Sequence, residues 1–447
     1  MSTGAHTAVV VGLGRSGFSA ARYLLRQGRR VAVTDSRVEP PELPRLRELE
    51  AQTGRRIDVR VGGFDAALLD AADLLVVSPG VARRGAFFEA AQARGLDVVG
   101  DVELFARAVR ARVAGVTGTN GKSTVTTLLA NMATRAGLRT RCGGNLGVPA
   151  LDLLDESTEL YVLELSSYQL ETTRSLALAA AVVLNVTPDH MDRYADLDAY
   201  GAAKQRIFAR CEVAVINLDD ARVASMIGCA PRSLSFSLRA DAGADYAVLA
   251  SENGRWLARR GEPLLPVASM KLTGAHNAAN ALAALALGEA LGLPPEAMLA
   301  ELRSFPGLPH RSQWVADVRG VRYVNDSKGT NVGATIAAVA GMDGPLLLIL
   351  GGDGKGQDFR ALRPALADKV RVALLIGRDA PRIARALEGI CECRPAQRLE
   401  AAVEMAAALS RPGDTVLLSP ACASLDMFRD YVHRGEVFEA AVRRLAA

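Results

Sequence analysis

Short apolar runs rich in Val, Ile and Leu alternate along the chain with longer stretches that are rich in Ala and Leu. This alternation is typical of β-α-β units, in which parallel strands form a sheet and helices cover its faces. The runs that predict strands fall into three groups: residues 8–11, 30–34 and 74–77; 113–116, 160–163, 181–184 and 213–216; and 322–324, 346–350, 372–376 and 415–418. The pattern therefore predicts an α/β fold of three domains, each a mostly parallel sheet with helices on its faces.

The boundaries between these groups follow from breaks in the pattern. The first group ends near Gly100, and residues 101–110 predict a helix that leads into the second. The stretch 305–309 reads Phe-Pro-Gly-Leu-Pro, which interrupts regular structure and predicts a linker or hinge. The expected domains are thus residues 1–100, 101–308 and 309–447, and a length of 447 residues agrees with about 150 residues per domain.

Composition narrows the class of protein. The chain is 49% hydrophobic and 23% charged, as globular proteins are, and its formal net charge of +4 includes no run of five or six like charges. Nucleic acid is therefore not expected as a partner. The six cysteines are scattered without a C-x-x-C pair, which favours a reducing compartment and argues against zinc. No apolar stretch approaches the roughly 20 residues that span a bilayer, so a cytoplasmic protein without a membrane partner is expected.

The first polar loop after a predicted strand reads G-x-G-x-x-G, with its glycines at Gly12, Gly14 and Gly17. Such glycines let backbone N–H groups approach a pyrophosphate at the start of a helix, and Asp35, at the end of the next strand, could accept ribose hydroxyls. Taken alone, the loop suggests NAD. The pattern marks a pyrophosphate, however, and does not say which nucleotide carries it; a purely structural tight turn is the alternative.

A second loop, Thr-Gly-Thr-Asn-Gly-Lys-Ser at residues 117–123, follows a predicted strand and opens a helix. Its backbone N–H groups would hold ATP phosphates, Lys122 would reach the β- and γ-phosphates, and Ser123 would bind Mg²⁺. It is not a strict Walker A sequence, because Val116 stands where that pattern has glycine. The residues expected to bind ATP here are Gly118, Thr119, Asn120, Gly121, Lys122, Ser123 and Thr124.

Other polar side chains follow the strands of the second group. Glu164 stands at a strand end and suits Mg²⁺, or else caps a helix. His190 lies in a loop, where a functional and a structural role are both open. Lys204 is predicted to be an ordinary, exposed helix lysine. Asn277 and Asn280 share one helix face and could bond a base or ribose, or cap the helix.

Three polar loops follow strands of the last group, at residues 325–331, 351–358 and 419–424. Ligands of open α/β sheets bind outside the carboxyl ends of the strands, so these loops predict a binding face. Lys328 and Lys355 supply cations that could meet carboxylates or a phosphate. Ordinary surface turns are the alternative.

The loop at 117–123 resembles the phosphate loop of the Mur ligases and of their folylpolyglutamate synthetase relatives. The resemblance extends over the whole chain through residues 143–147, 164–169, 185–194, 202–204, 276–280 and 307–311. In the last third, residues 325–328, 351–355 and 419–426 resemble the branch of the family that adds D-glutamate. The Asp-Asn-Pro-Arg signature of the branch that adds diaminopimelate or lysine is absent, and folylpolyglutamate synthetases lack a counterpart of the first domain.

The resemblance implies an ATP-dependent ligase of peptidoglycan precursor synthesis. It would join D-glutamate to UDP-N-acetylmuramoyl-L-alanine through an acyl phosphate, as a monomer acting on small molecules. The implied domains are Rossmann-like, P-loop NTPase-like and again Rossmann-like. The first glycine loop would then hold the UDP part of the substrate and not NAD; the implied contacts are Ser16, Asp35, Ser36, Arg37, Gly80 and Asn145.

The resemblance also implies roles for the remaining residues. Ser123 and Glu164 would bind one Mg²⁺, His190 would bind a second, and Lys204 would be carbamylated. The implied catalytic residues are Lys122, Glu164, His190 and Lys204. Besides the phosphate loop, ATP would contact Asn277, Asn280, Arg311 and Asp326. D-Glutamate would contact Lys328, Thr330, Lys355, Ser424 and Tyr431, the last at a position where this branch can carry Phe.

Three alternatives stay open. The chain could be another ligase of the Mur or folylpolyglutamate type with a different amino acid. It could be an NAD-linked oxidoreductase, although the loop at 117–123 and the last domain would then be unexplained. It could also be a regulator that binds ATP without turnover. For the ligase, the third domain is expected to swing onto the central one, because water would destroy an acyl phosphate.

Overall fold

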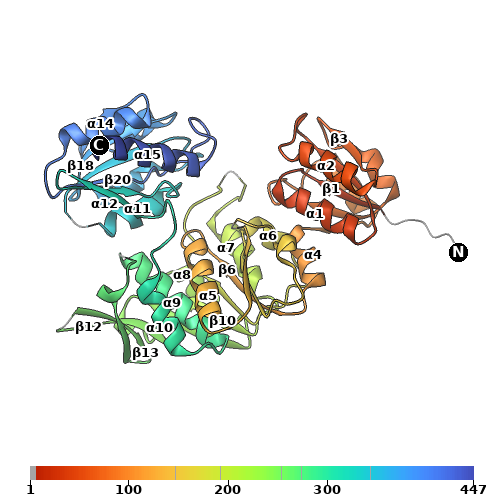
Figure 1. Ribbon diagram of the computed structural model, residues 1–447, viewed down its shortest axis with the longest axis horizontal. Coiled ribbons are helices and arrows are strands. Elements are labelled where there is room, and N and C mark those ends of the chain that lie inside the picture. The colour runs from red at the N-terminus through yellow and green to blue at the C-terminus, as the bar shows by residue number, and fades with distance from the viewer. Residues whose placement is uncertain are drawn as a thin grey trace.

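The computed structural model describes residues 7–145, 147–191, 193–252, 254–272, 274–342 and 344–446. Leu146 and Asp192, which belong to two of the blocks named above, lie outside this part of the chain. Three separate sheets with their helices follow one another along the sequence and form three bodies in space (Figure 1). The expected α/β fold of three mostly parallel sheets is confirmed.

The N-terminal sheet has five parallel strands in the order β3-β2-β1-β4-β5. All five residues of β1 are buried, because helices cover both faces, and this is why its sequence is apolar without alternation. The strand order changes direction at β1 and β4, so the glycine loop after β1 lies at the switch point where such sheets bind ligands. The elements are β1 (Thr7–Val11), α1 (Arg15–Arg26), β2 (Arg30–Asp35), α2 (Leu43–Thr53), β3 (Asp58–Val61), η1 (Ala66–Ala71), β4 (Ala72–Val77), α3 (Ala86–Ala93) and β5 (Asp97–Val99).

The central sheet has nine strands in the order β14-β13-β12-β11-β10-β9-β6-β8-β7. The pairs β12–β13 and β13–β14 are antiparallel, and the other pairs are parallel. The phosphate loop follows β6, which lies inside the sheet between β9 and β8. The strands are β6 (Arg112–Thr117), β7 (Thr140–Gly144), β8 (Leu160–Glu164), β9 (Ala180–Val183), β10 (Val213–Asn217), β11 (Arg232–Ser237), β12 (Tyr246–Ser251), β13 (Gly254–Arg259) and β14 (Glu262–Pro266).

Helices cover both faces of the central sheet. One face packs on α5, α9 and α10, which contact one another and enclose an alanine- and leucine-rich core. The other face packs on α4, α6 and α7. The helices are α4 (Asp101–Ala108), α5 (Lys122–Arg135), α6 (Ser167–Glu171), α7 (Leu197–Gln205), α8 (Ala221–Ala224), α9 (Ala275–Ala290) and α10 (Pro295–Ser304), with the short turns η2 (Ala150–Leu153), η3 (Arg206–Phe208), η4 (Ala240–Ala242) and η5 (Val267–Ser269).

The C-terminal sheet has six strands in the order β15-β16-β20-β17-β18-β19, all parallel except β15. Its two faces form two cores, one under α11, α12 and α13 and one under α14 and α15. The elements are β15 (Gln313–Val318), β16 (Val321–Asn325), α11 (Val332–Ala340), β17 (Leu346–Gly351), η6 (Phe359–Leu362), α12 (Arg363–Leu366), β18 (Val370–Ile376), α13 (Ala380–Ala386), β19 (Glu392–Pro395), α14 (Leu399–Leu409), β20 (Thr415–Leu418) and α15 (Tyr431–Ala446).

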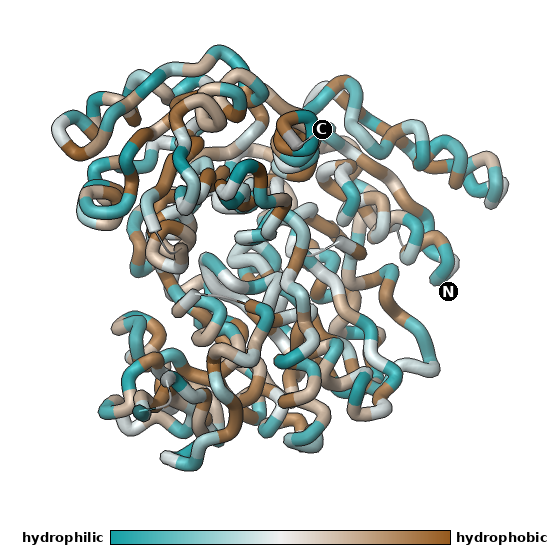
Figure 2. The backbone as a smooth tube through the Cα atoms, turned by 60° about the vertical axis from the view of Figure 1, so that its left-hand side comes forward, coloured by the Kyte–Doolittle hydropathy of each residue, from teal (hydrophilic) through white to brown (hydrophobic). Residues whose placement is uncertain are grey.

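Hydropathy alternates along the outer helices in Figure 2, as expected of helices with one buried and one exposed face. Every predicted strand overlaps an observed one. The strands that the pattern missed lie toward sheet edges; β3, for example, buries none of its four residues fully. The domain boundaries at residues 100 and 308 stay predictions. In the described part of the chain, no helix is long and apolar enough to cross a membrane.

Candidate active site

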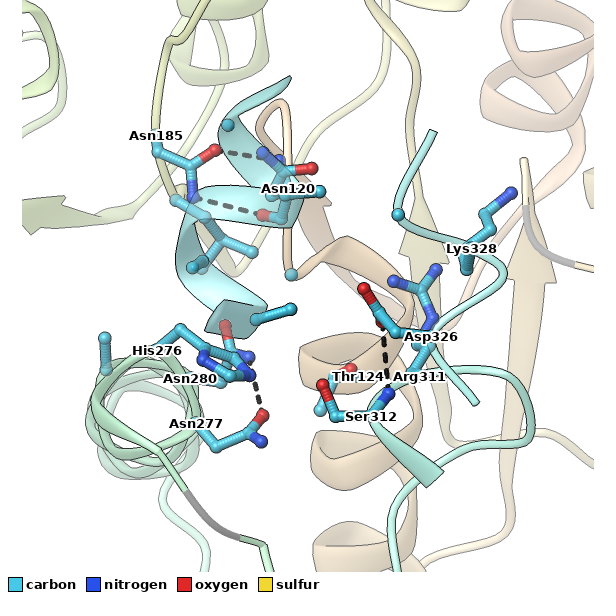
Figure 3. A pocket seen from close by; sticks show the side chains of 18 of the residues that line it. Asn120, Thr124, Asn185, His276, Asn277, Asn280, Arg311, Ser312, Asp326 and Lys328 are labelled. Atoms are coloured by element: carbon cyan, nitrogen blue, oxygen red, sulfur yellow. Dashed lines mark hydrogen bonds between the residues drawn. The ribbon is translucent and has the colours of Figure 1, made fainter. Parts of the chain in front are cut away.

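The phosphate loop leaves β6 and opens α5 at Lys122. Gly121 has a φ of 85°, and a Cβ atom there would lie 2.4 Å from Oδ1 of Asn280, so only glycine fits. Asn185, from the loop after β9, holds the phosphate loop with two hydrogen bonds (Figure 3). Its Oδ1 accepts from the Asn120 N–H at 2.8 Å, and its Nδ2 donates to the Asn120 carbonyl at 3.1 Å. The loop is thus fixed before any ligand binds.

Lys122 folds back over the loop that precedes it. Its Nζ donates to the carbonyl groups of Gly118 at 2.9 Å and Thr119 at 2.8 Å. Burial lowers the pKa of Lys122, and the charge of Glu164 opposes that shift. Next along α5, the Ser123 Oγ accepts from Nη2 of Arg311 at 2.6 Å, so the start of α5 is reached by a residue beyond the 305–309 linker.

Glu164 ends β8 beside the phosphate loop and is 3% exposed. Its Oε1 accepts from Asn145 Nδ2 at 2.6 Å, whereas Oε2 is buried and has no hydrogen-bond partner among the described residues. Burial raises the pKa of Glu164, but the charge of Lys122 and neighbouring donors hold it below the ordinary value. An ionised, buried oxygen without a partner is costly unless a cation binds it, and Mg²⁺ prefers such oxygen ligands. The donor set therefore fits Mg²⁺.

The prediction that Lys204 is an exposed helix lysine is wrong, because Lys204 is only 1% exposed. The helix α7 carries it inward, where its Nζ donates to the Gly118 carbonyl at 2.9 Å and lies 4.2 Å from the centre of the Tyr200 ring. Burial, and then the charge of Lys122, lower the pKa of Lys204 well below its ordinary value. Local sequence gave no sign of this, because a single lysine in a short helix carries no information about which face is covered.

His190 lies on the same side of the site. Its φ of 57° is uncommon for a residue other than glycine, and such strain is often found at functional sites. The ring packs between Tyr168 and Tyr200, and its Nε2 lies 3.8 Å from Oδ2 of Asp189. Burial lowers the pKa of His190, so the imidazole is neutral at pH 7. The charges of Lys355, Lys122 and Lys204 also lower the pKa of His190, and the charge of Asp189 opposes them.

A cavity of about 260 Å³ lies beside the phosphate loop, between α5, α9 and α11 (Figure 3). Of the residues predicted to bind ATP, it is lined by Asn120, Gly121, Thr124, Asn277, Asn280, Arg311 and Asp326. Gly118, Thr119, Lys122 and Ser123 do not line it, although they belong to the loop at its edge. Asn280 Nδ2 donates to Asn277 Oδ1 at 3.2 Å, so the two amides lie on one helix face as their spacing predicted. Asn217, Phe236 and His276 also line the cavity and were not predicted.

A second cavity, of about 580 Å³, opens between the N-terminal and central domains. All six residues predicted to contact the UDP substrate line it: Ser16, Asp35, Ser36, Arg37, Gly80 and Asn145. The Asp35 carboxylate is already engaged, since Oδ2 accepts from the Leu13 N–H at 2.6 Å and the Arg37 guanidinium bonds both oxygens. Ser78 and Gln169 also line the cavity and were not predicted.

The residues predicted to contact D-glutamate lie on three loops and one helix of the C-terminal domain. Lys328 follows β16, and its Nζ lies 3.8 Å from the centre of the Tyr431 ring at the start of α15. Burial and neighbouring cations lower the pKa of Lys328 to about 8. Lys328 lines the 260 Å³ cavity; Thr330, Lys355, Ser424 and Tyr431 line neither of the two cavities.

Comparison with known proteins identifies each domain. Residues 6–100 match the family model of the Mur ligase MurD-like N-terminal domain, residues 116–288 the Mur ligase middle domain, and residues 310–422 the Mur ligase glutamate ligase domain. The chain is 51% identical over 444 residues to a UDP-N-acetylmuramoylalanine–D-glutamate ligase of Nitrosococcus oceani, covering 99% of this chain and 97% of the relative. It is 52% identical to the enzyme of that name from Methylobacillus flagellatus, covering 98% and 96%.

Solved structures share the fold. The UDP-N-acetylmuramate–alanine ligase MurC of Thermotoga maritima superposes with a TM-score of 0.61 at 18% identity, covering 98% of this chain and 99% of that one. A pseudomurein peptide ligase type C of Methanothermus fervidus superposes with the same score at 17% identity, covering 98% and 100%. With matches in all three domains and over nearly the full length of its relatives, the chain belongs to the Mur ligase family.

Proposed function

We propose that this chain joins D-glutamate to UDP-N-acetylmuramoyl-L-alanine, with ATP converted to ADP and phosphate. One observation carries the proposal. Asn145 lines the cavity between the first two domains, and its amide bonds Glu164 beside the phosphate loop at 2.6 Å. A nucleotide substrate in that cavity would thus end next to the γ-phosphate of ATP. An NAD-linked oxidoreductase would leave the phosphate loop and Glu164 without a role.

The residue roles follow from this placement. ATP would bind the phosphate loop and the 260 Å³ cavity through Asn277, Asn280, Arg311 and Asp326. The six predicted residues that line the larger cavity would hold the UDP substrate, with Asp35 acting by fixing Leu13 and Arg37. Lys328, Thr330, Lys355, Ser424 and Tyr431 would receive D-glutamate. Lys328 and Lys355 supply the positive charge that a dicarboxylate requires.

Ser123 and Glu164 would hold Mg²⁺, and His190 a second ion. Bound there, the metal neutralises charge when two anions are brought together. Lys204 would be carbamylated, a step in which its neutral Nζ forms a bond to the carbon of CO₂ and releases a proton. The low pKa of the buried Lys204 amine supplies the neutral form that this step needs.

The chemistry has two stages. The carboxylate of the nucleotide substrate attacks the γ-phosphorus of ATP, and ADP leaves. Lys122 stabilises the charge on the transferred group and holds it in line. The amine of D-glutamate then attacks the acyl carbon, and phosphate leaves. That amine must lose a proton, which His190, if it holds no metal, or a neighbouring carboxylate such as Asp189 would accept.

Closure of the third domain would exclude water from the acyl phosphate. We infer domains of 1–100, 101–308 and 309–447, acting as a monomer in the cytoplasm, with a hinge in the 305–309 segment. Small-angle scattering should show a smaller radius of gyration when an ATP analogue and the nucleotide substrate are both present. Profiles that do not change would contradict the hinge.

Phosphate release tests the reaction itself. With ATP, Mg²⁺ and UDP-N-acetylmuramoyl-L-alanine present, D-glutamate, L-glutamate, L-lysine and diaminopimelate are supplied in turn. Release that depends on D-glutamate alone is the expected result. Dependence on another amino acid would keep the ligase chemistry and overturn the choice of substrate, whereas no release with any of them would favour the ATP-binding regulator.

Carbamylation of Lys204 has a separate test. Activity should fall when CO₂ is removed from the buffers and return on addition of bicarbonate. Lys204→Ala should lose most of its turnover and should not respond to bicarbonate. Lys271, which is exposed, offers the matched control, because Lys271→Ala should behave as the wild type in both respects. Near-normal turnover of Lys204→Ala would remove this lysine from the mechanism.

A further inference from the structure

A fully buried arginine lies directly beneath the loops that carry the proposed D-glutamate contacts. Arg434, one turn into α15, is 0% exposed. Its Nε donates to Ser327 Oγ at 3.0 Å and its Nη2 to the Ser327 carbonyl at 2.8 Å, while Nη1 donates to the Cys422 carbonyl at 3.1 Å. Among the described residues, no carboxylate oxygen lies within 4.0 Å of its nitrogens.

Such a group is expensive to bury. A guanidinium out of water and without a carboxylate partner destabilises a fold unless other interactions compensate for the lost hydration. Burial lowers the pKa of Arg434 to about 10, so the side chain still carries its charge at neutral pH. An apolar side chain of similar volume would fill the same space without this cost. The charge therefore calls for an explanation beyond packing.

The three hydrogen bonds of Arg434 connect two separate loops. Ser327 immediately precedes Lys328 in the loop after β16, and Cys422 stands two residues before Ser424 in the loop after β20. Ser327 Oγ in turn donates to the Tyr431 carbonyl at 2.8 Å. The loops that carry Lys328 and Ser424 are thus fixed relative to each other and to the first turn of α15.

The third loop joins the same unit through its backbone. The Asp353 N–H donates to the Ala423 carbonyl at 3.0 Å, and the Ala423 N–H donates to the Asp353 carbonyl at 2.8 Å. Lys355 lies two residues after Asp353 and Ser424 directly after Ala423. Consequently, four of the proposed D-glutamate contacts, Lys328, Lys355, Ser424 and Tyr431, belong to one bonded assembly with Arg434 at its base.

We propose that Arg434 is a positioning residue for the amino-acid substrate. It sets the distance between the Lys328 and Ser424 loops, and its fixed positive charge below them favours a dicarboxylate. The proposal rests on the D-glutamate ligase function proposed above. Arg434 itself lines neither the ATP nor the UDP cavity, so its effect should be largest for the amino-acid substrate.

The test compares two substitutions at this position with a control on the same helix. Arg434→Lys keeps the charge but cannot serve all three acceptors with one planar group, and Arg434→Met removes the charge. Arg443→Met is the control, because the Arg443 side chain is 73% exposed on α15. For each variant, kcat and KM are measured by phosphate release, varying ATP, UDP-N-acetylmuramoyl-L-alanine and D-glutamate one at a time.

The expected result is a selective rise in one KM. For Arg434→Met the KM for D-glutamate should rise at least about tenfold, because hydrogen bonds from a charged group are lost, while both other KM values stay within about twofold. Arg434→Lys should show a smaller rise of the same kind. Arg443→Met should match the wild type in all three.

Two results would overturn the proposal. One is an equal change in all three KM values or a loss of kcat alone, which a merely structural arginine would produce. The other is a wild-type KM for D-glutamate in Arg434→Lys; this variant decides the matter if Arg434→Met does not fold. Failure of the proposed function is recognised separately, because the wild-type protein itself would then release no phosphate in response to D-glutamate.

Discussion

The two junctions between domains are built differently. Between the N-terminal and central domains the hydrophobic core is continuous, and one cluster includes Val10 of β1, Phe105 of α4 and Tyr161 of β8. The C-terminal domain has two cores of its own, and neither includes a residue of the central sheet. Figure 1 shows the N-terminal and C-terminal domains at separate places on the central domain.

Polar contacts follow the same division. At the first junction, Asp152 of η2 accepts from Ser19 at 2.6 Å and pairs with Arg22 at 2.7 Å, both on α1. At the second, the Asn331 amide meets the Asn120 amide at 3.3 to 3.5 Å and Asp189 Oδ2 at 3.3 Å. A shorter contact, from Arg311 Nη2 to Ser123 Oγ at 2.6 Å, also crosses this junction, so polar contacts hold it without a shared apolar core. We therefore expect the proposed UDP cavity to be rigid and the proposed D-glutamate face to be completed by movement.

The largest expected effect comes from locking the second junction, between the central and C-terminal domains. A Cβ atom at Gly333 of α11 would lie 3.3 Å from Oγ1 of Thr187, so Thr187→Cys with Gly333→Cys brings two thiols within reach of a disulfide. If opening and closing accompany each cycle, oxidation should lower turnover at least about 100-fold, and reduction should restore it. Phosphate release before and after reductant measures the effect.

The matched control locks the other junction. Ser19 Oγ donates to Asp152 Oδ1 at 2.6 Å across this junction, so Ser19→Cys with Asp152→Cys is the corresponding double variant, used once a thiol count shows that its disulfide forms. Turnover of this variant should stay within about twofold on oxidation if the first junction does not move. The wild type, treated identically, accounts for oxidation of the native cysteines. Equal inhibition of both cross-linked variants would erase the contrast between the junctions.

The second prediction concerns a substitution that weakens the first junction, between the N-terminal and central domains. Arg193 donates to the Pro79 carbonyl at 3.0 Å and to Glu171 at 3.1 Å, and its guanidinium lies 3.8 Å from the centre of the Tyr168 ring. Pro79 lines the UDP cavity. Arg193→Ala should destabilise the protein by about 1.5 to 3 kcal/mol and raise the KM for the nucleotide substrate roughly tenfold or more.

Thermal unfolding and the three KM values report this effect. The KM for ATP should stay near the wild-type value, because Arg193 does not line the 260 Å³ cavity. Arg193→Lys should recover part of the loss, since an ammonium can serve one acceptor but not the planar fork. If the KM for ATP rises as much as that for the nucleotide substrate, Arg193 does not act through the UDP cavity.

Sequence pattern predicted the buried strands better than the edges. The run at 346–350 is apolar throughout because β17 is covered on both faces, and such a strand is recognisable without its neighbours. The strands β12, β13 and β14 were missed because they form an antiparallel extension at one edge, with mixed polar and apolar residues. Edge strands carry a weaker signal, since one side of each meets solvent.

For the site, sequence predicted which loops lie close together but not how their side chains are oriented. The rule that ligands bind at strand ends brought Glu164 and the phosphate loop together correctly, because parallel strands end at one edge. Burial of Lys204 and of Arg434 could not be read from their own helices, since packing by other elements decides it. The clamp by Asn185 was also missed, because its partner Asn120 is far away in sequence.

The third prediction contrasts the two sites by pH. Lys328 binds a carboxylate only as an ammonium, and the pKa of Lys328 is lowered to about 8 by burial and neighbouring cations. Its contribution to kcat/KM for D-glutamate should therefore be complete below pH 7 and fall about tenfold by pH 9. At the UDP cavity, burial raises the pKa of Asp35 but the Arg37 hydrogen bonds outweigh it, so that carboxylate stays ionised and the nucleotide KM should be flat.

Deprotonation of the D-glutamate amine raises the rate over the same pH range. The readout is therefore kcat/KM for D-glutamate of the wild type divided by that of Lys328→Arg, whose guanidinium stays charged. Unfolding would not explain a falling ratio. The folded protein loses the Lys328 proton more easily than the unfolded chain, so this group stabilises the fold increasingly as pH rises from about 8. A ratio independent of pH would mean that the Lys328 charge does not contribute to D-glutamate binding.

The smallest effect is expected for Arg83, which pairs with Glu171, the same carboxylate that pairs with Arg193. Arg83 Nη2 lies 3.6 Å from Oε2 of Glu171, and its side chain is more exposed than that of Arg193. A long, solvated ion pair contributes little, so Arg83→Ala should change the free energy of unfolding by less than about 0.5 kcal/mol and leave every KM unaltered. Chemical denaturation of the two single variants and the double variant separates the pairs. If Arg83→Ala costs as much as Arg193→Ala, then charge on Glu171, and not the bonded geometry around Pro79, is what holds the first junction.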